Sequence, residues 1–485
     1  MADERTETLR VLHVSPEVAP FSKVGGLGDV AGALPPALRR QGVDCRIVTP
    51  AWDGILDAIR DRGLPLTRVS RGVEAVVRWE ILRGTVWKCL VDDLPVYLLD
   101  SPLFGGRRIY PNDVTADSVI PFLFLSLAAL DLPESIRWRP RIIHCHDWTT
   151  APVIGALTWH QYYRRFFNDY RTVFTIHNLA HQGILPLQTL NEWGIAQDAF
   201  QPEAMEFYGD GNLMKGAIVG ATAVTTVSPT YAREIQTDAG GEGLGGLLRS
   251  LGHKTMGIMN GIDTDFWNPE TDPLIPANYT RDDLSGKDAC RAAFMRMAGW
   301  EDDGRPLFVS VGRLVEQKGL PILLPALEAL VHRGCRFFFL GSGQPEYEWG
   351  LNQATERWPD AVQCYIGYDE PLGHLAYSAG DFFLMPSRFE PCGLSQLISF
   401  RYGTIPVARY VGGIADSVFE HDGQRGNGFL FYDYSTASLV EAVSRAQAAY
   451  RDEGLRRRLQ ARGMEEDHSW NRSAPLYKAL YASLF

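Results

Sequence analysis

The chain repeats one order of segments at two distant places: a short apolar strand, a glycine-containing turn, a helical segment and a second strand. The first copy runs from residues 10–15 (RVLHVS) to 43–50 (VDCRIVTP). The second copy occupies residues 306–341, from PLFVSVGRL to CRFFFLGSG. This order predicts a βαβ unit, and two such starts predict two similar α/β domains. Because any two βα units resemble each other, the repeat by itself supports duplication of a fold and nothing more specific.

Further short apolar runs continue the pattern. They lie at 141–147, 171–178, 221–228, 361–368, 381–387, 403–409 and 428–434. Apolar strands separated by helices are typical of a parallel sheet covered on both faces. We therefore predict two doubly wound parallel-sheet domains, with a boundary around residues 250–262. Ligands bind beyond the carboxyl ends of such strands, so two facing domains would hold a ligand in the cleft between them.

Length and composition narrow the class of protein. The 485 residues are 45% hydrophobic and 22% charged, which suits two or three globular domains and excludes disordered, collagen-like and coiled-coil proteins. The formal net charge of −11 opposes binding to nucleic acid or to an anionic membrane, so a neutral or small-molecule partner fits better.

The cysteines and the apolar runs predict the cellular compartment of the protein. The seven cysteines are odd in number and include no C-x-x-C pair, which favours a reducing cytoplasm over a disulfide framework. The first ten residues are charged and polar, and no uninterrupted apolar run approaches the length that spans a bilayer. We expect a protein that neither spans a membrane nor is exported.

A glycine-containing turn, residues 23–29 (KVGGLGD), follows the first strand and opens a helix. Its glycines let backbone N–H groups approach an anion, and Lys23 adds a positive charge. The turn suits a phosphate or a negatively charged leaving group, although a simple tight turn is an equal alternative. A second glycine-rich stretch, 239–250 (AGGEGLGGLLRS), follows no clear strand, so we expect a mobile loop there rather than a phosphate loop.

Two cations and one carboxylate follow strands in the second half. Arg313 and Lys318 lie five residues apart, where they could counter the charge of a departing diphosphate. Glu390 precedes a Pro-Cys-Gly turn that leads into a helix, so it could bind sugar hydroxyls or stabilise positive charge at an anomeric carbon. Solvated surface side chains are the alternative for all three.

Histidine and aspartate residues also end strands. His144, His146 and Asp147 lie in HCHDW, and His177 and Asn178 lie in FTIHN. Clustered His and Asp can bind a metal, but no H-E-x-x-H or cysteine cluster completes a familiar site. Hydrogen bonding to sugar or phosphate is therefore favoured.

Two weaker signals point to a turn and a stacking face. The lone D-x-D at 263–265 lies beside Asn260 and Gly261, which indicates a turn rather than a metal site. Most of the 12 tryptophans should be core residues, whereas Tyr368 closes a strand where a ligand base could stack.

In their order along most of the chain, these motifs resemble those of the bacterial glycogen synthases and plant starch synthases. The resemblance rests on SPEVAPFSKVGGLGDV, HCHDW, VFTIHNLAHQG, IMNGIDTDFWNP, VGRLVEQKG, SRFEPCGLSQL, RYGTIPV and GGIADSV. The family has the GT-B architecture, in which two Rossmann-like domains hold the active site in the cleft between them. The resemblance implies an acceptor-side domain (1–255), a nucleotide-sugar domain (256–467) and a C-terminal helix (468–485) that crosses back to the first domain.

The resemblance also implies an activity. The enzyme would transfer glucose from ADP-glucose to the non-reducing end of an α-1,4-glucan, retain the α configuration, use no metal or cofactor and release ADP. Its partners would be ADP-glucose and glycogen or a maltooligosaccharide, in the cytoplasm, with no nucleic acid or membrane. Retention needs either two displacements or attack from the leaving-group face. We favour the second route, in which the donor phosphate takes the acceptor proton and Glu390 has a binding or electrostatic role.

Single residues acquire roles by the same resemblance. It implies a catalytic set of Glu390, His177, Arg313 and Lys318. It implies a donor-binding set of Lys23, Gly25, Gly26, Asp29, Asn260, Tyr368, Cys392, Gly393 and Leu394. Asp147 would lie on the acceptor side, and no residue would bind a metal. Domain closure would bring Arg313 and Lys318 toward Lys23.

This chain departs from the family pattern only mildly. Thr149 and GGIADSV replace commoner family residues, which affects acceptor details. Ile398 stands where sucrose- and trehalose-type relatives carry a second Glu, in agreement with the glycogen and starch synthase branch.

Other classes of protein fit the motifs less well. A phosphorylase-like GT-B enzyme needs a pyridoxal phosphate lysine, and none of the seven lysines lies in a matching context. A catalytically silent glucan-binding protein would have no chemical reason to keep Lys23, Arg313, Lys318 and Glu390 together. A nucleotide-dependent oxidoreductase needs G-x-G-x-x-G with a following acid, and neither domain start has it.

Overall fold

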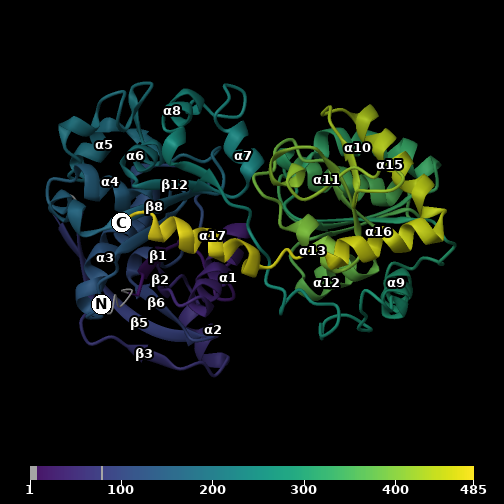
Figure 1. Ribbon diagram of the computed structural model, residues 1–485, viewed down its shortest axis with the longest axis horizontal. Coiled ribbons are helices and arrows are strands. Elements are labelled where there is room, and N and C mark those ends of the chain that lie inside the picture. Colours follow the sequence, from purple (N-terminus) through teal and green to yellow (C-terminus); the bar gives the residue numbers. More distant parts are fainter. Residues whose placement is uncertain (1–7, 78–79) are drawn as a thin grey trace, which may run out of the picture. The chain divides into compact units, whose positions relative to one another are not determined.

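The computed structural model describes residues 8–77 and 80–485. The chain divides into two compact units, Met1–Gly261 with Trp470–Phe485, and Ile262–Ser469. Each unit is built around its own sheet, and helices lie over the sheet in each (Figure 1).

The first unit contains a mainly parallel sheet that has ten strands in the described part of the chain. In sheet order these are β13 (Thr255–Gly257), β12 (Ala223–Thr226), β8 (Arg171–Ile176), β7 (Ile142–His146), β1 (Arg10–Val14), β2 (Asp44–Pro50), β6 (Leu94–Asp100), β5 (Glu80–Val91) and β3 (Leu66–Arg68), with β4 (Val73–Val77) paired to β5. The strands from β13 to β6 run parallel, and β5 reverses the direction at the edge. A smaller antiparallel sheet consists of β9 (Ile184–Pro186), β10 (Glu206–Phe207) and β11 (Asp210–Asn212).

The helices of the first unit are α1 (Gly26–Arg40), α2 (Ile55–Asp61), α3 (Ala116–Ser135), α4 (Ala151–Trp159), α5 (Leu187–Glu192), α6 (Leu213–Gly220), α7 (Pro229–Glu234), α8 (Gly245–Ser250) and α17 (Trp470–Ala482). Helix α3 is long and apolar enough to cross a membrane by length and composition alone. However, 67% of its apolar window is buried inside the fold, where it packs on α4 and β4. Its apolarity therefore fits a core helix.

Helix α17 is the last helix of the chain and packs beside α1 in the first unit (Figure 1). Its residues Tyr477 and Tyr481 are fully buried. The Lys478 ammonium donates to the carbonyl of Gln41, and Ser473 Oγ donates to the carbonyl of Met259. The helix is thus held by both apolar burial and polar contacts at its sides.

The second unit contains a sheet of six parallel strands among the described residues. Their order is β16 (Val362–Ile366), β15 (Arg336–Gly341), β14 (Leu307–Val311), β17 (Phe382–Met385), β18 (Ile405–Arg409) and β19 (Phe429–Phe431). The strand order reverses between β14 and β17, which is the topological switch point where doubly wound sheets bind ligands.

The helices of the second unit are α9 (Ser285–Met297), α10 (Leu320–His332), α11 (Pro345–Arg357), α12 (Glu370–Ala379), α13 (Ser395–Arg401), α14 (Gly412–Ala415), α15 (Thr436–Tyr450) and α16 (Glu453–Glu465). Helices α10, α11 and α15 lie over one face of the sheet, and α9, α12 and α13 over the other (Figure 1). The core between sheet and helices includes Phe308, Phe337, Phe382 and Leu327, all nearly inaccessible to solvent.

The fold class predicted from the sequence is confirmed, and each apolar run from which a strand was predicted contains one. One local prediction is wrong. Residues 245–250 form helix α8 rather than part of a mobile loop. A Cβ on Gly241 or Gly245 would lie 2.5 or 2.3 Å from the carbonyl oxygen of Thr237, so these glycines serve close backbone packing.

Candidate active site

Two of the three charged residues that the motifs indicated in the second unit, Lys318 and Glu390, are in direct contact. The Lys318 ammonium donates to Glu390 Oε2 at 2.6 Å, and Ser387 Oγ donates to the same oxygen at 3.0 Å. Lys318 follows β14, and Glu390 follows β17, so the contact spans the switch point. Glu390 is only 5% exposed, so its buried carboxylate is stabilised by the positive charge of Lys318 and by the hydrogen bond from the Ser387 hydroxyl.

Glycines fix the two loops that carry this ion pair. Gly319 has a φ of +83°, and a Cβ there would lie 2.0 Å from the carbonyl oxygen of Pro386. The turn after Lys318 can therefore approach the loop after β17 only because residue 319 is glycine. Gly393 has a φ of +71° and leads through Leu394 into α13.

The predicted donor-binding residues Cys392, Gly393 and Leu394 lie on this same loop. Cys392 and Gly393 are buried, and Leu394 is half-buried at the start of α13. The amide of Gly413 donates to the carbonyl of Glu390 at 3.1 Å, so the loop is also tied to α14. The structure thus brings three residues that were predicted to bind the nucleotide-sugar donor close to Glu390.

Arg313 lies at the same sheet edge and is exposed. Its guanidinium donates to Gln317 Oε1 at 3.1 Å, and Gln317 in turn donates to the carbonyl of Phe389 at 3.3 Å. A small pocket at this edge is lined by Gly312, Arg313, Leu314, Lys318, Met385, Ser387 and other residues of β14 and β17. Two cations at one pocket form an arrangement that can counter the charge of a diphosphate.

Tyr368 follows β16 and is 76% exposed. It lies at the carboxyl end of the sheet, as the Lys318 and Glu390 loops do. Its stacking role stays a prediction.

In the first unit, the glycine-containing turn after β1 is held by a buried carboxylate. Glu17 Oε2 accepts hydrogen bonds from the amides of Val24 and Gly25, and the Tyr110 hydroxyl donates to Glu17 Oε1 at 2.9 Å. Glu17 is 1% exposed, and burial raises the pKa of its carboxyl group. The turn is therefore fixed from inside the fold.

Four residues predicted to bind the sugar donor, Lys23, Gly25, Gly26 and Asp29, lie on this turn and in the first turn of α1. Lys23 Nζ lies 2.7 Å from Asp29 Oδ1, and both side chains are about one third exposed. Gly25 is the N-cap of α1 and Gly26 its first residue. Backbone amides at a helix N-terminus and a lysine together suit an anion.

Asp147 and His177 lie together at the ends of β7 and β8. Asp147 Oδ1 accepts from the amide of His177 at 2.7 Å and from the amide of Asn178 at 3.3 Å. Asp147 also has a positive φ of 58°, uncommon for a residue other than glycine. Burial raises the pKa of Asp147 to about 7 and lowers the pKa of His177 to about 3. Asp147, predicted on the acceptor side, thus also braces the His177 loop.

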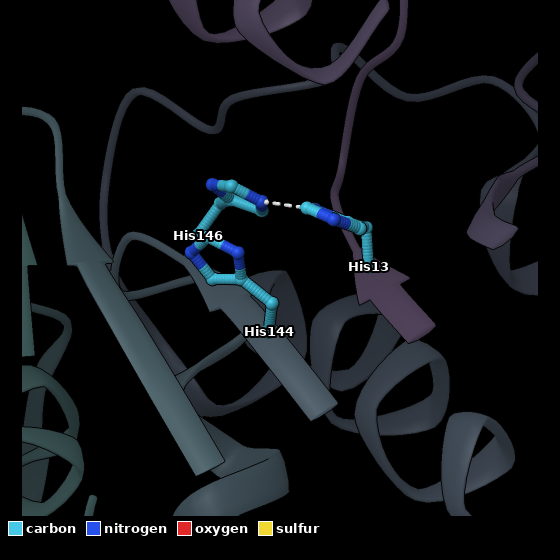
Figure 2. A group of neighbouring side chains, drawn as sticks. All are labelled: His13, His144 and His146. Carbon is cyan, nitrogen blue, oxygen red and sulfur yellow. Dashed lines mark hydrogen bonds between the residues drawn. The ribbon is translucent and has the colours of Figure 1, made fainter. Parts of the chain in front are cut away.

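A cluster of histidines lies beneath His177. His13 of β1 pairs in register with His144 of β7, and His146 lies two residues further along the same face (Figure 2). His13 Nδ1 and His146 Nε2 are 3.2 Å apart, and His146 Nδ1 and His177 Nε2 are 3.0 Å apart. One ring nitrogen from each of His13, His144 and His146 lies within 4.8 Å of the other two, which is close enough for the three to bind a metal ion.

Asn260 follows β13 and is only 5% exposed. Its Oδ1 is buried and has no hydrogen-bond partner within residues 8–77 and 80–485. An unsatisfied buried oxygen is costly, so a ligand donor at this position would relieve the cost.

Sequence reasoning missed Glu17 and His13 as parts of the site. Both were visible in the sequence, His13 inside the first strand and Glu17 directly after it in SPEVAP. An ionisable residue inside or next to a strand expected to be buried is the signal that could have found them.

Two family models match the chain. The model described as "Starch synthase catalytic domain" matches residues 10–250, and the model described as "Glycosyl transferases group 1" matches residues 295–465. A glycogen synthase of Anaeromyxobacter dehalogenans (strain 2CP-C) is 46% identical over 98% of this chain and 100% of that protein. A glycogen synthase of Myxococcus xanthus is 42% identical over 98% and 99%.

Solved structures agree with the sequence matches. The catalytic domain of starch synthase IV from Arabidopsis thaliana, bound to ADP and acarbose, matches with a TM-score of 0.91 and 36% identity over 98% of this chain and 99% of that chain. A sucrose-phosphate synthase from Thermosynechococcus elongatus, with a TM-score of 0.62 and 17% identity over 98% and 99%, shares the fold.

The two sheets and these matches define an enzyme of the GT-B class of glycosyltransferases. More narrowly, the chain belongs to the glycogen synthase family of retaining glycosyltransferases. The family resemblance given by the motifs is confirmed.

Proposed function

We propose that this protein is a glycogen synthase that transfers glucose from ADP-glucose to the non-reducing end of an α-1,4-glucan, with retention of configuration, and releases ADP. The observation that carries the proposal is the Lys318–Glu390 pair beside Arg313 at the switch point of the second sheet. It is supported by the likeness to a starch synthase bound to ADP and acarbose.

The charges of the second unit suit departure of a nucleoside diphosphate. As the bond from the anomeric carbon to oxygen breaks, negative charge builds on the diphosphate and positive charge on the sugar. Arg313 and Lys318 would stabilise the diphosphate. Glu390 orients the Lys318 ammonium, and its carboxylate would stabilise the sugar cation.

The first unit would supply neutral hydrogen bonds and one anion-binding turn. Lys23, Gly25 and Gly26 would contact the donor, with Asp29 holding Lys23 in place. His177 would bind the donor sugar. Asn260 would bind it through an oxygen that is unsatisfied within the described residues. In the second unit, Tyr368 would stack on the adenine ring, and Cys392, Gly393 and Leu394 would line the glucose and distal phosphate.

We also propose that the reaction needs no metal and no bound cofactor, and that it takes place in a reducing cytoplasm without nucleic acid or membrane. The seven cysteines are all free thiols, which fits such a compartment.

The experiment compares ADP-glucose and UDP-glucose as donors, with glycogen as primer and EDTA present. Nucleotide release and glucan growth are measured for the wild type, for Glu390→Gln, and for Arg357→Gln as a control on the exposed face of α11. We expect growth with ADP-glucose, a loss of about 100-fold or more in kcat for Glu390→Gln, and wild-type rates for the control. Growth only with UDP-glucose would overturn the donor, and an unaffected Glu390→Gln variant would overturn the proposed site.

A further inference from the structure

Three imidazole rings form a hydrogen-bonded series that ends at His177. The series runs from His13 Nδ1 to His146 Nε2 at 3.2 Å, and from His146 Nδ1 to His177 Nε2 at 3.0 Å (Figure 2 shows the first of these bonds). His146 therefore uses both ring nitrogens on other imidazoles. His177 has no bond at Nδ1 to any residue of the described ranges, which leaves that atom for a ligand.

The rings in this series are neutral at physiological pH. Burial lowers the pKa of His13 to about 3, and it lowers the pKa of His146 well below the ordinary histidine value. Within the described residues, no hydrogen bond of His13, His146 or His177 side chains goes to a carboxylate. A neutral imidazole has one N–H and one lone pair, so each bond in the series fixes the direction of the next.

The unpartnered nitrogen of His13 determines which ring nitrogen donates in each hydrogen bond of the series. His13 Nε2 is buried without a partner in the part of the chain that the structure describes. Orphaned buried N–H groups are rarer than unpaired acceptors, so the proton of His13 belongs on Nδ1. His13 then donates to His146 Nε2, His146 donates through Nδ1–H to His177 Nε2, and the proton of His177 is on Nδ1.

We propose that His146 is a positioning residue that holds the His177 ring in the Nδ1–H tautomer, so that His177 offers a neutral hydrogen-bond donor to a sugar oxygen. The proposal rests on the function proposed above. It assigns His177 the role of a fixed donor rather than of a general acid, because a ring that stays neutral does not deliver a proton.

A metal ion fits the same histidines less well. The rings of His144 and His146 are stacked, with centroids 4.3 Å apart and planes 28° apart, so their lone pairs run side by side instead of converging. His144 also uses both nitrogens, Nδ1 with the Tyr481 hydroxyl at 2.7 Å and Nε2 with Thr175 Oγ1 at 2.6 Å. A hydrogen-bonded series accounts for the contacts without an ion.

Paired variants of the full chain separate positioning from packing. Asn places its amide nitrogen where His has Nδ1, so His146→Asn keeps the donor to His177. His146→Gln carries the same amide one methylene further out and lacks that donor. His146→Leu removes all polar groups. Histidine-selective ¹⁵N labelling and long-range ¹H–¹⁵N spectra, without substrate, report which nitrogen of His177 is protonated, with His177→Gln to assign the signal.

We expect the wild type and His146→Asn to show His177 protonated on Nδ1, and His146→Leu and His146→Gln to shift the proton to Nε2. In the transferase assay, kcat should fall about 10- to 100-fold in His146→Leu and His146→Gln but recover in His146→Asn, while KM for ADP-glucose changes less. If His146→Leu does not fold, His13→Leu tests the same point from a residue that does not touch His177. It should alter the His177 tautomer, whereas His13→Asn should not.

Three results would overturn the inference. They are a wild-type His177 protonated on Nε2, a His146→Asn variant no better than His146→Gln, and a stoichiometric transition metal in the purified protein that His13→Asn removes. A wild type with no transferase activity would instead contradict the proposed function, because the tautomer is measured without substrate.

Discussion

Glu17 illustrates, at the scale of a single residue, how a buried side chain can serve a site that it does not enter. Its carboxylate accepts from two amides of the Lys23–Gly26 turn and from Tyr110. Replacing it by Gln would put an N–H₂ group in place of one acceptor oxygen, so the side chain could no longer accept all three hydrogen bonds. The turn should then loosen and lose part of its preorganisation for an anion.

We therefore predict that Glu17→Gln raises KM for ADP-glucose about tenfold, with a smaller effect on kcat, since one or two hydrogen bonds are lost. Steady-state kinetics with varied ADP-glucose measures the change. Glu328→Gln, an exposed residue paired with Arg357, is the control and should behave as the wild type. An unchanged KM would show that Glu17 does not hold the turn.

Gly319 has a backbone conformation and a close neighbour that both disfavour any side chain. Its φ of +83° and the approach of Pro386 O to 2.0 Å from a built Cβ make Ala doubly unfavourable. Gly304 has a similar φ of +79° but open space around its Cβ position. Gly304→Ala should cost about 1 kcal/mol of unfolding free energy, and Gly319→Ala about 2–4 kcal/mol with loss of activity. Equal costs in urea unfolding would contradict the steric argument.

Motifs in the sequence predicted the residues Lys318 and Glu390, but not their contact. The contact depends on the crossing of two loops 72 residues apart in sequence, and that crossing follows from strand order. The His13–His146 bond is likewise a product of strand pairing in the first sheet. Residue roles implied by the family remain predictions that the variants above test.

At the scale of elements, apolar runs predicted the strands because a strand of a parallel sheet is buried on both faces and its sequence is therefore apolar along its length. The small sheet of β9, β10 and β11 and helix α8 were not predicted. These elements are two to six residues long, too short for a hydrophobic period to appear. Helix α8 also follows glycines whose role is close packing, and glycine normally indicates a loop.

A buried hydrogen bond ties helix α17 to the first sheet. Its Tyr481 hydroxyl bonds to His144 Nδ1 at 2.7 Å, and both groups are fully buried. Tyr481→Phe keeps the ring but leaves a buried imidazole nitrogen without its partner, which should cost about 1–3 kcal/mol. Thermal unfolding measures this, with Tyr365→Phe on β16, 43% exposed, as the control.

Removal of residues 468–485 should have a much larger effect than Tyr481→Phe. It would expose the faces of α1 and β7 that Tyr477 and Tyr481 cover, so stability and activity should fall together. A truncated chain with unchanged melting temperature and activity would contradict the structural role of α17.

At the scale of the whole molecule, buried histidines predict the direction of acid denaturation. The pKa values of His13 and His177 are lowered to about 3, whereas histidines of the unfolded chain titrate near 6.5. Between these values only the unfolded chain takes up protons, so stability is lost as pH falls from about 6.5 toward 3. His144 and His146, whose pKa values are also lowered, act in the same direction.

Asp147 acts in the opposite direction. Its pKa is raised to about 7, so its contribution is complete below about 3.8 and is lost as pH rises through 7. Glu17 and Asp381, whose pKa values burial also raises, act as Asp147 does. Because the five histidines with lowered pKa values, His160 included, outnumber these three carboxyl groups, the urea midpoint should fall between pH 6.5 and pH 4.5, and His13→Asn should reduce the slope. A midpoint that stays constant or rises toward acid would contradict the burial of neutral histidines.

The central claim, transfer of glucose with retention to the non-reducing end of a glucan, is tested most directly on the product. A maltooligosaccharide with a labelled reducing end is incubated with ADP-glucose that carries ¹³C at its anomeric carbon, and the product is examined by ¹³C NMR and by chain length. We predict new α-1,4 linkages at the unlabelled end, with one ADP released for each glucose added. A β linkage, growth at the labelled end, or release of free glucose without chain growth would contradict the account.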